Sequence, residues 1–194
     1  MKYKTRCKDT KPRAFIQGSM GLCPCFFITT ENSFEKSLGE AEYSVILGSV
    51  WNVYIPLLRA TLSPVFSTLK ELLDTYLAMP QVDNKRIYVI GLSMGGMGTY
   101  DLAIRYPELF AAAIPICGTV NANRLKAAKD VKFRIYHGDN DNVVPVSGSR
   151  QAYKALKAAG ADVEYIEFPG GTHGSWNPAF TQPDFMRWLF SQKK

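Results

Sequence analysis

The pattern that limits the possible folds of this chain more than any other is Gly-Leu-Ser-Met-Gly at residues 91–95. A β-rich apolar run at 86–90 precedes it, and a helical pattern over 94–106 follows it. Glycines two residues before and after the serine let the backbone turn sharply and leave the serine hydroxyl exposed. We therefore predict a strand–turn–helix unit with Ser93 at its apex, in preference to a tight turn with an idle serine.

From residue 63 onward the chain alternates between helical and strand patterns. We expect helices over 63–80, 94–106, 147–159 and 183–191, and strands over 86–90, 110–116, 133–136 and 163–168. Alternation at this spacing predicts a three-layer α/β fold, in which helices flank a mostly parallel central sheet. In such sheets the chemistry gathers at the carboxyl ends of the strands, so functional residues are expected there.

The first sixty residues are less regular, and strands over 14–16, 25–29 and 43–55 are expected without a defined order. Residues 1–13 hold six basic residues and one acidic residue, so they account for +5 of the formal charge of +6. This is typical of a mobile basic tail, which leaves 14–194 as a single and nearly neutral domain. Because no basic face with interleaved aromatic residues follows the tail, nucleic-acid binding is not expected.

The apolar segments and the cysteines indicate the cellular compartment of the protein and whether it binds a metal. No apolar run is long enough to cross a bilayer, and the stretch 14–28 is too interrupted by polar residues, glycines and Pro24 to be a good secretion signal. Of the four cysteines, Cys23 and Cys25 are too close together for a usual zinc site, and the chain has only two histidines to complete one. We expect free thiols, no metal and a cytoplasmic setting in preference to export, whereas the oligomeric state is not indicated.

A neutral serine needs a base within hydrogen-bond reach, and the two histidines are the candidates. His137 follows the predicted strand 133–136, where a histidine is often a packed structural residue. His173 lies in the glycine-rich loop 169–176, which can carry a side chain over the edge of the sheet. The chain order serine, acid, histidine that accompanies this kind of turn also favours His173 as the base.

The acid that orients the base is expected between Ser93 and His173 in the sequence, beyond another strand end. The segment 137–145 offers Asp139 and Asp141, and either of them could instead cap a turn. The task of this acid is to accept the imidazole N–H, which fixes the tautomer, and to stabilise the imidazolium. Spacing alone does not choose between the two aspartates.

Four blocks of the chain, taken together and in order, resemble the esterase branch of the α/β-hydrolases. They are residues 87–96, 106–118, 137–145 and 170–176. The similarity spans about residues 63–192 and is greatest to the predicted peptidases and the polyhydroxybutyrate-depolymerase-like or feruloyl-esterase-like enzymes, which are relatives of the phospholipase/carboxylesterase group. The resemblance implies that Asp141, three residues after the His-Gly pair, is the acid. It also implies that the backbone N–H of Met94 forms half of an oxyanion hole.

Upstream of residue 63 the chain departs from that family. The family takes its second oxyanion donor from a His-Gly-rich loop, whose counterpart here is 15–21, with Gln17 in place of the usual histidine and Ser19 as the candidate donor. The segment before residue 63 is also shorter than in these enzymes, so one or two N-terminal edge strands are expected to be missing. This departure concerns the activity more than the fold.

The resemblance implies a serine hydrolase that cleaves small carboxylic esters through an acyl-serine, without a cofactor. Thr119 and Trp176 are expected to border the substrate pocket, although core packing is an equal role for Trp176. One alternative is a peptidase of the oligopeptidase type, but the chain has no room for the gating domain that such enzymes usually carry. The other is an inactive or binding scaffold with a defective oxyanion loop. The identity of the ester cannot be read from fold similarity.

Overall fold

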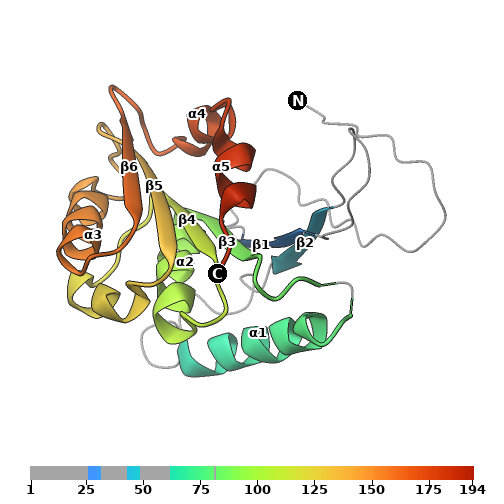
Figure 1. The fold of residues 1–194 in the computed structure, drawn as a ribbon. Helices are drawn as coiled ribbons and strands as arrows, with labels where there is room; N and C mark the ends of the chain where they lie inside the picture. Colours follow the sequence, from blue (N-terminus) through green and yellow to red (C-terminus); the bar gives the residue numbers. More distant parts are fainter. Residues whose placement is uncertain (1–25, 32–42, 49–61, 81) are drawn as a thin grey trace.

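The computed structural model of the chain describes residues 26–31, 43–48, 62–80 and 82–194, which are coloured in Figure 1. A six-stranded sheet lies at its centre, in the spatial order β2-β1-β3-β4-β5-β6. The strands are β1 Phe26–Glu31, β2 Tyr43–Gly48, β3 Ile87–Leu92, β4 Ala112–Ile116, β5 Lys132–Gly138 and β6 Val163–Phe168. The helices are α1 Leu62–Leu77, α2 Met94–Arg105, α3 Ser147–Ala158, α4 Trp176–Phe180 and α5 Phe185–Ser191, together with a 3₁₀ helix, η2, at Ala122–Ala128.

The sheet is mostly parallel, as the sequence predicts. Strands β3, β4, β5 and β6 are parallel to one another, whereas β1 is antiparallel to both β2 and β3. The carboxyl ends of the four parallel strands therefore lie along one edge. Strands β1 and β2 correspond to the predicted strands at 25–29 and 43–55, on the side where a shortened edge is expected. The predicted strand at 14–16 and the basic tail 1–13 lie outside the described residues.

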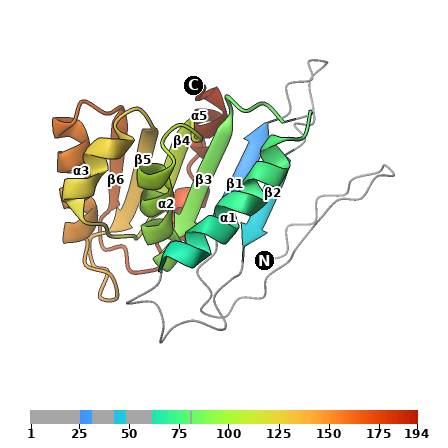
Figure 2. The same cartoon turned by 90° about the horizontal axis from the view of Figure 1, so that it is seen from below.

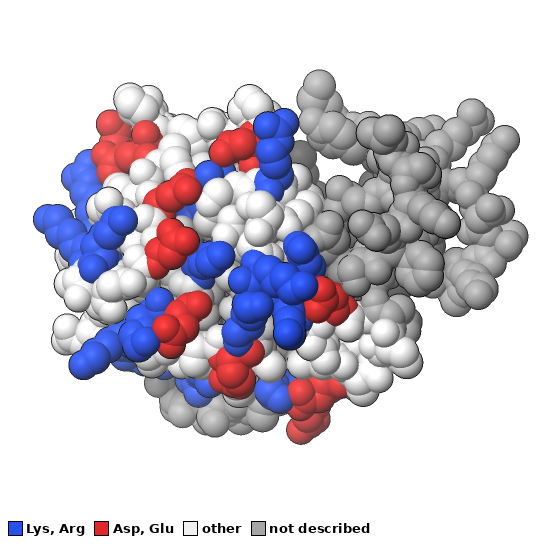
Figure 3. Space-filling model, in the orientation of Figure 1, with Lys and Arg blue, Asp and Glu red and all other residues white. Residues whose placement is uncertain are grey.

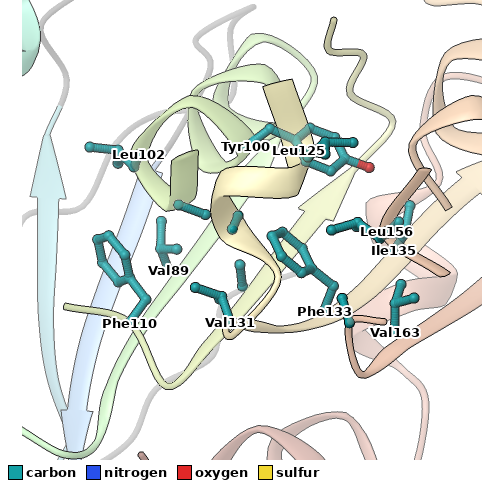
Figure 4. Close-up of a cluster of buried hydrophobic side chains, with 14 of the residues drawn as sticks. Val89, Tyr100, Leu102, Phe110, Leu125, Val131, Phe133, Ile135, Leu156 and Val163 are labelled. Carbon is teal, nitrogen blue, oxygen red and sulfur yellow. The ribbon is translucent and has the colours of Figure 1, made fainter. Parts of the chain in front are cut away.

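Alternate side chains of the parallel strands point to opposite faces of the sheet, and helices cover both faces. Val89 and Phe133 belong to the first face, where they pack with residues of α2, η2 and α3 (Figure 4). Leu73 of α1 belongs to the same cluster. Tyr88 and Ile90 belong to the second face, which is covered by α4 and α5. In Figure 2, α1, α2 and α3 lie in front of the sheet and α5 lies behind it. The predicted three-layer arrangement is confirmed.

One charged side chain, Arg134 of β5, lies within the apolar second face. Its side chain is 7% exposed, and its guanidinium group contacts Glu164 of β6 at 2.6 Å and Asp184 at 2.9 Å. The same group lies 4.5 Å from the centre of the Trp188 ring. A buried charge is tolerated when it is paired and hydrogen-bonded in this way. These contacts tie the start of α5 to the sheet, close in sequence to the loop that carries His173.

Three features differ from the sequence expectations. β5 runs to Gly138, so His137 lies inside the strand and not after it. The last helix begins at Phe185, later than expected, and the short helices α4 and η2 are additional. The extension of β5 depends on its pairing with β6, because Gly138 lies opposite Phe168. Such bounds depend on contacts between distant segments, which local periodicity does not contain.

The surface carries charged side chains of both signs, which alternate on the face drawn in Figure 3. Asp101 contacts Arg105 at 2.5 Å and Arg124 at 2.6 Å, and Lys70 contacts Asp74 at 2.6 Å. Exposed pairs of this kind each contribute about 0–1 kcal/mol to stability, so most of the stability comes from the two apolar clusters. No helix in the described part of the chain has both the length and the apolar content needed to span a bilayer.

Helix α2 approaches the turn after β4 very closely, at Gly96 and Gly118. A Cβ atom added to Gly96 would lie 2.7 Å from the carbonyl oxygen of Ile116 and 3.2 Å from the Cα of Gly118. These neighbours are backbone atoms, which cannot swing aside as the end of a long side chain can. Gly96 therefore sets how closely the start of α2, and with it Ser93, sits against the sheet.

We expect Gly96→Ala to lower the free energy of unfolding by about 1–3 kcal/mol, because the added methyl group overpacks this contact. Urea unfolding followed by circular dichroism measures the change. Gly174→Ala is the matched control, since its added Cβ would meet nothing closer than 3.8 Å, and it should change stability by less than about 0.5 kcal/mol. Equal effects at the two positions would show that the close approach at Gly96 does not matter.

Candidate active site

Ser93 lies in a strained turn between β3 and α2. Its backbone has φ 55° and ψ −116°, a region that non-glycine residues rarely adopt. Its N–H donates to the carbonyl oxygen of Ile116 at 2.9 Å, which fixes the turn to the neighbouring strand. A Cβ atom on Gly91 would lie 2.0 Å from the carbonyl oxygen of Gly95, so the turn itself requires glycine at 91. This is the strand–turn–helix unit that the sequence predicts.

His173 is carried by the loop between β6 and α4, and hydrogen bonds join this loop to the one after β5. The N–H of Asn140 donates to the Gly171 carbonyl at 2.9 Å, that of Gly170 to the Asp139 carboxylate at 2.6 Å, and that of Gly138 to the Ser175 hydroxyl at 2.9 Å. Gly170 has φ 68°, a conformation that favours glycine. These contacts bring His173 beside Asp141 at the edge of the sheet.

The side chains of Ser93, His173 and Asp141 form one continuous chain of hydrogen bonds. His173 Nε2 lies 2.8 Å from Ser93 Oγ, and His173 Nδ1 lies 2.8 Å from Asp141 Oδ2. Because an ionised carboxylate can only accept, Nδ1 carries the hydrogen and Nε2 is left to accept from the serine hydroxyl. This geometry can remove the proton of Ser93 as its oxygen attacks a carbonyl carbon.

The carboxylate of Asp141 is buried, and its side chain is 0% exposed. Its Oδ1 accepts the N–H groups of Val143 at 2.8 Å and Val144 at 2.9 Å. Burial alone would raise the pKa of Asp141, but the hydrogen bonds from His173 and from these two N–H groups outweigh it, and the pKa lies below its usual value. The carboxylate is therefore ionised at neutral pH and can stabilise an imidazolium.

Asp139, the other aspartate that spacing leaves open, has a different partner. It is exposed, and its Oδ1 accepts the N–H of Gly170 at 2.6 Å. The structure therefore brings Asp141 to the imidazole of His173, whereas Asp139 contacts the backbone of the loop that carries His173. Asp141 therefore has the contact that the acid of the family resemblance needs, and its role as the acid stays a prediction.

Of the two predicted oxyanion donors, the structure describes one. Met94 directly follows Ser93 and is the first residue of α2. The N–H of a first helical residue has no acceptor within its own helix, so it is available to a ligand. Ser19 and Gln17, which belong to the predicted second donor loop, lie outside the described residues. The second half of the oxyanion hole therefore stays a prediction.

The two predicted pocket residues, Trp176 and Thr119, are both half-buried. Trp176 begins α4 and turns its ring edge-on to His173, with 5.5 Å between the ring centres and 86° between the planes. It is half-buried and also packs against the cluster on the second face, so its contacts fit both roles proposed from the sequence. Thr119 is half-buried in the turn after β4, where it packs closely against Gly148 of α3. Its role in a pocket stays a prediction.

Two buried residues lie beside this constellation that the sequence does not place in the site, although it offers His137 as the less favoured candidate base. His137 is 0% exposed, and its Nε2 lies 3.1 Å from Asp141 Oδ2. Cys117 is also 0% exposed and has φ 42° in the turn after β4. The spacing of His137 and Asp141, four residues apart, was the available signal. At the end of a strand, however, that spacing does not imply a contact.

Cys117, Asp141 and His173 form a group that could hold a metal ion, since one ligand atom from each lies within 4.8 Å of the others among the described residues. Burial raises the pKa of the Cys117 thiol to about 12, so it is protonated at neutral pH and is a poor ligand. Asp141 and His173 are already bonded to each other. The chemistry of this group fits an acid–base pair better than a metal centre.

The chain has recognisable relatives among known proteins. The Dienelactone hydrolase family matches residues 13–184. Homoserine O-acetyltransferase from Desulfotalea psychrophila is 34% identical over 106 residues, which cover 53% of this chain and 25% of that protein. Cutinase 1 from Thermobifida cellulosilytica is 32% identical over 93 residues, which cover 48% of this chain and 35% of that protein.

Among solved structures, the chain is similar to a thermostable esterase. The TM-score is 0.64 with 38% sequence identity, and the match covers 68% of this chain and 37% of the esterase. The chain thus spans well under half the length of each of these relatives, between 25% and 37%.

We expect Asp141→Asn to lower kcat for a short p-nitrophenyl ester by roughly 10³–10⁴-fold, because the imidazole loses the acceptor that fixes its tautomer. Asp139→Asn is the matched control, since it neutralises a carboxylate in the same loop whose partner is a backbone N–H. It should cost less than about tenfold, the value of one ordinary hydrogen bond. Steady-state kinetics of both variants measure this, and the reverse ranking would refute Asp141 as the acid.

The lowered pKa of Asp141 also predicts a pH dependence of stability. Its folded-state pKa lies below the usual value of 3.8, so its ionised form contributes stability that is complete above the unfolded pKa and is lost as the pH falls through the folded pKa. Asparagine cannot be protonated in this range. The difference in unfolding free energy between the wild type and Asp141→Asn should therefore shrink from neutral pH toward about pH 3. Urea unfolding across this range tests it, and a difference that grew with acidity would contradict it.

Proposed function

The chain belongs to the dienelactone hydrolase family, and we propose that it is a serine hydrolase that cleaves carboxylic esters with Ser93, His173 and Asp141. The observation that carries this proposal is the unbroken chain of hydrogen bonds from Ser93 through His173 to the buried Asp141, with 2.8 Å at both links. The three groups follow β3, β6 and β5, at the edge of the sheet where α/β folds place their chemistry. Acyl transfer through serine needs these three parts: a nucleophile, a base and an acid that orients the base.

In the proposed reaction, Ser93 Oγ attacks the ester carbonyl carbon while Nε2 of His173 takes the hydroxyl proton. The carbonyl oxygen becomes an oxyanion, which in this proposal accepts a hydrogen bond from the N–H of Met94, the first residue of α2. The imidazolium then gives its proton to the departing alcohol, and an acyl-serine remains. Water, deprotonated by His173, hydrolyses the acyl-serine and releases the acid. Asp141 stays ionised and holds Nδ1 of His173 throughout.

The relatives support an ester in preference to a peptide. One is named a cutinase, and a similar solved structure is an esterase. Another is named an O-acetyltransferase, which describes transfer of an acyl group to an alcohol, and an acyl-serine serves hydrolysis and transfer alike. Because this chain spans 25% to 37% of these proteins, their individual substrates do not carry over to it.

Ser93→Ala tests the nucleophile directly. We expect it to lower turnover of a short p-nitrophenyl ester by at least about 10⁴-fold, and His173→Ala to be about as damaging, because members of a triad act as a unit. Intact mass after treatment with a fluorophosphonate probe should show one adduct on the wild type and none on Ser93→Ala. Ser191→Ala, at an exposed serine of α5, is the matched control and should keep both labelling and turnover.

The outcomes separate the candidate functions. Turnover retained by pure Ser93→Ala protein would refute the proposed nucleophile. Labelling of Ser93 without ester turnover would instead support a scaffold with a defective oxyanion loop. A parallel assay with a peptide p-nitroanilide distinguishes a peptidase, and product analysis with an added alcohol distinguishes acyl transfer from hydrolysis.

A further inference from the structure

His137 is a buried imidazole beside the proposed triad that the reaction above leaves without a role. It lies near the end of β5 and is 0% exposed. Its Nε2 lies 3.1 Å from Asp141 Oδ2 and 3.0 Å from the carbonyl oxygen of Val144. Both of these neighbours are acceptors, so Nε2 of His137 must carry a hydrogen.

The other ring nitrogen of His137 meets helix α3. Its Nδ1 lies 2.7 Å from the hydroxyl oxygen of Ser149, which is itself 0% exposed and lies 3.1 Å from the carbonyl oxygen of Gly118. Both ring nitrogens therefore have partners, and the ring is held between α3 and the turn that carries Asp141. A hydrocarbon side chain could fill the same space, so what histidine adds here is the pair of polar contacts.

Asp141 Oδ2 thus receives two imidazole N–H groups, from His173 at 2.8 Å and from His137 at 3.1 Å. The second donor restrains rotation of the carboxylate and shares the negative charge of the oxygen that faces His173. A hydrogen bond to the charged form of a carboxylate stabilises that form. Because part of its charge is shared, this oxygen stabilises the imidazolium form of His173 less than an oxygen with a single donor would.

We propose that His137 is a positioning residue for this reaction. It holds Asp141 Oδ2 in line with His173, and it reduces the extent to which that oxygen stabilises the protonated form of His173. The inference rests on the proposed function, because it takes Ser93 and His173 as the reacting pair. Without the second donor, the charged form of His173 is favoured, and His173 can accept the Ser93 proton only at higher pH.

The other ionisable groups around His137 do not change their protonation state near neutral pH. Glu167 of β6 lies opposite His137 in the strand register, and hydrogen bonds from Arg150 of α3 hold the pKa of Glu167 at about 2. Burial raises the pKa of the Cys117 thiol at the end of β4 to about 12, and burial also raises the pKa of the Tyr100 phenol on α2. Asp141 is ionised throughout this range, as argued above. A pH-dependent change near neutrality therefore reports on the imidazoles.

The whole chain contains two histidines, so nuclear magnetic resonance of protein made with isotopically labelled histidine observes both rings directly. At neutral pH we expect a protonated Nε2 at His137. In His137→Leu, which removes the donor, the titration midpoint of His173 should move to higher pH by about half a unit to one unit. His137→Gln, whose amide N–H can reach the position of Nε2, should return the midpoint most of the way to the wild-type value.

Turnover of a short p-nitrophenyl ester should follow the same order. We expect His137→Leu to lose roughly tenfold to a hundredfold in kcat, the range found when a partner behind a metal-ligating histidine is removed. The acid limb of the kcat/KM profile should move to higher pH, and KM should change little because His137 is fully buried. Tyr88→Phe is the matched control, since it removes a buried hydrogen bond to the Gln192 carbonyl near the other end of β3. It should lower stability without moving the pH profile.

An unprotonated Nε2 at His137 would overturn the inference, and so would a folded His137→Leu protein with an unchanged His173 titration. If His137→Leu does not fold, the tautomer in the wild type and the His137→Gln titration decide the matter. Failure of the proposed function would give a different experimental result. The wild type would then turn over no ester, while the ring signals would still show whether His137 donates to Asp141.

Discussion

Three backbone hydrogen bonds across the carboxyl edge of the sheet hold the site together. In each of them the residue that follows one strand donates its N–H to the next strand along: Ser93 to Ile116, Cys117 to Tyr136, and Asp139 to Phe168. Ser93 and Cys117 have φ values of 55° and 42°, which side-chain-bearing residues keep only where their surroundings enforce them. The bonds link the ends of the four parallel strands in a row, so each turn leaves the sheet in a fixed direction. A serine, an aspartate and a histidine from three different turns meet because these directions converge.

The buried negative charge of Asp141 affects both the stability of the fold and the proposed proton transfer. The Asp141 carboxylate accepts two backbone N–H groups on one oxygen and two imidazole N–H groups on the other. An ionised carboxylate buried without partners would cost several kcal/mol, so each donor contributes to the folded state. The hydrogen bonds from His173, Val143 and Val144 keep the carboxylate ionised, and the bond to His173 orients its ring toward Ser93. A substitution that removes one of them is therefore expected to affect folding and proton transfer together.

The second face of the sheet supports the loop that carries His173. The Ser175 hydroxyl accepts a hydrogen bond from the N–H of Gly138 and donates one to the carbonyl oxygen of Thr172. These bonds close the loop onto the end of β5. Trp176 then packs its ring edge-on to His173, and Arg134 holds the start of α5 through Asp184. The last two helices thus do more than cover apolar strands, because they also anchor the segment that follows the His173 loop.

Local features of this protein follow from its sequence, and the contacts between distant segments do not. Glycine spacing around Ser93 specifies a sharp turn, and the alternation of helical and strand patterns specifies a parallel sheet, because both depend on backbone geometry over a few residues. The choice of Asp141 over Asp139 is different. Both lie in one turn, and what separates them is which carboxylate faces a histidine 32 residues further along the chain. The contacts of His137 likewise depend on how β5, α3 and the following turn pack together. Spacing along the chain cannot show such contacts, since they are set by strand register and helix packing in three dimensions.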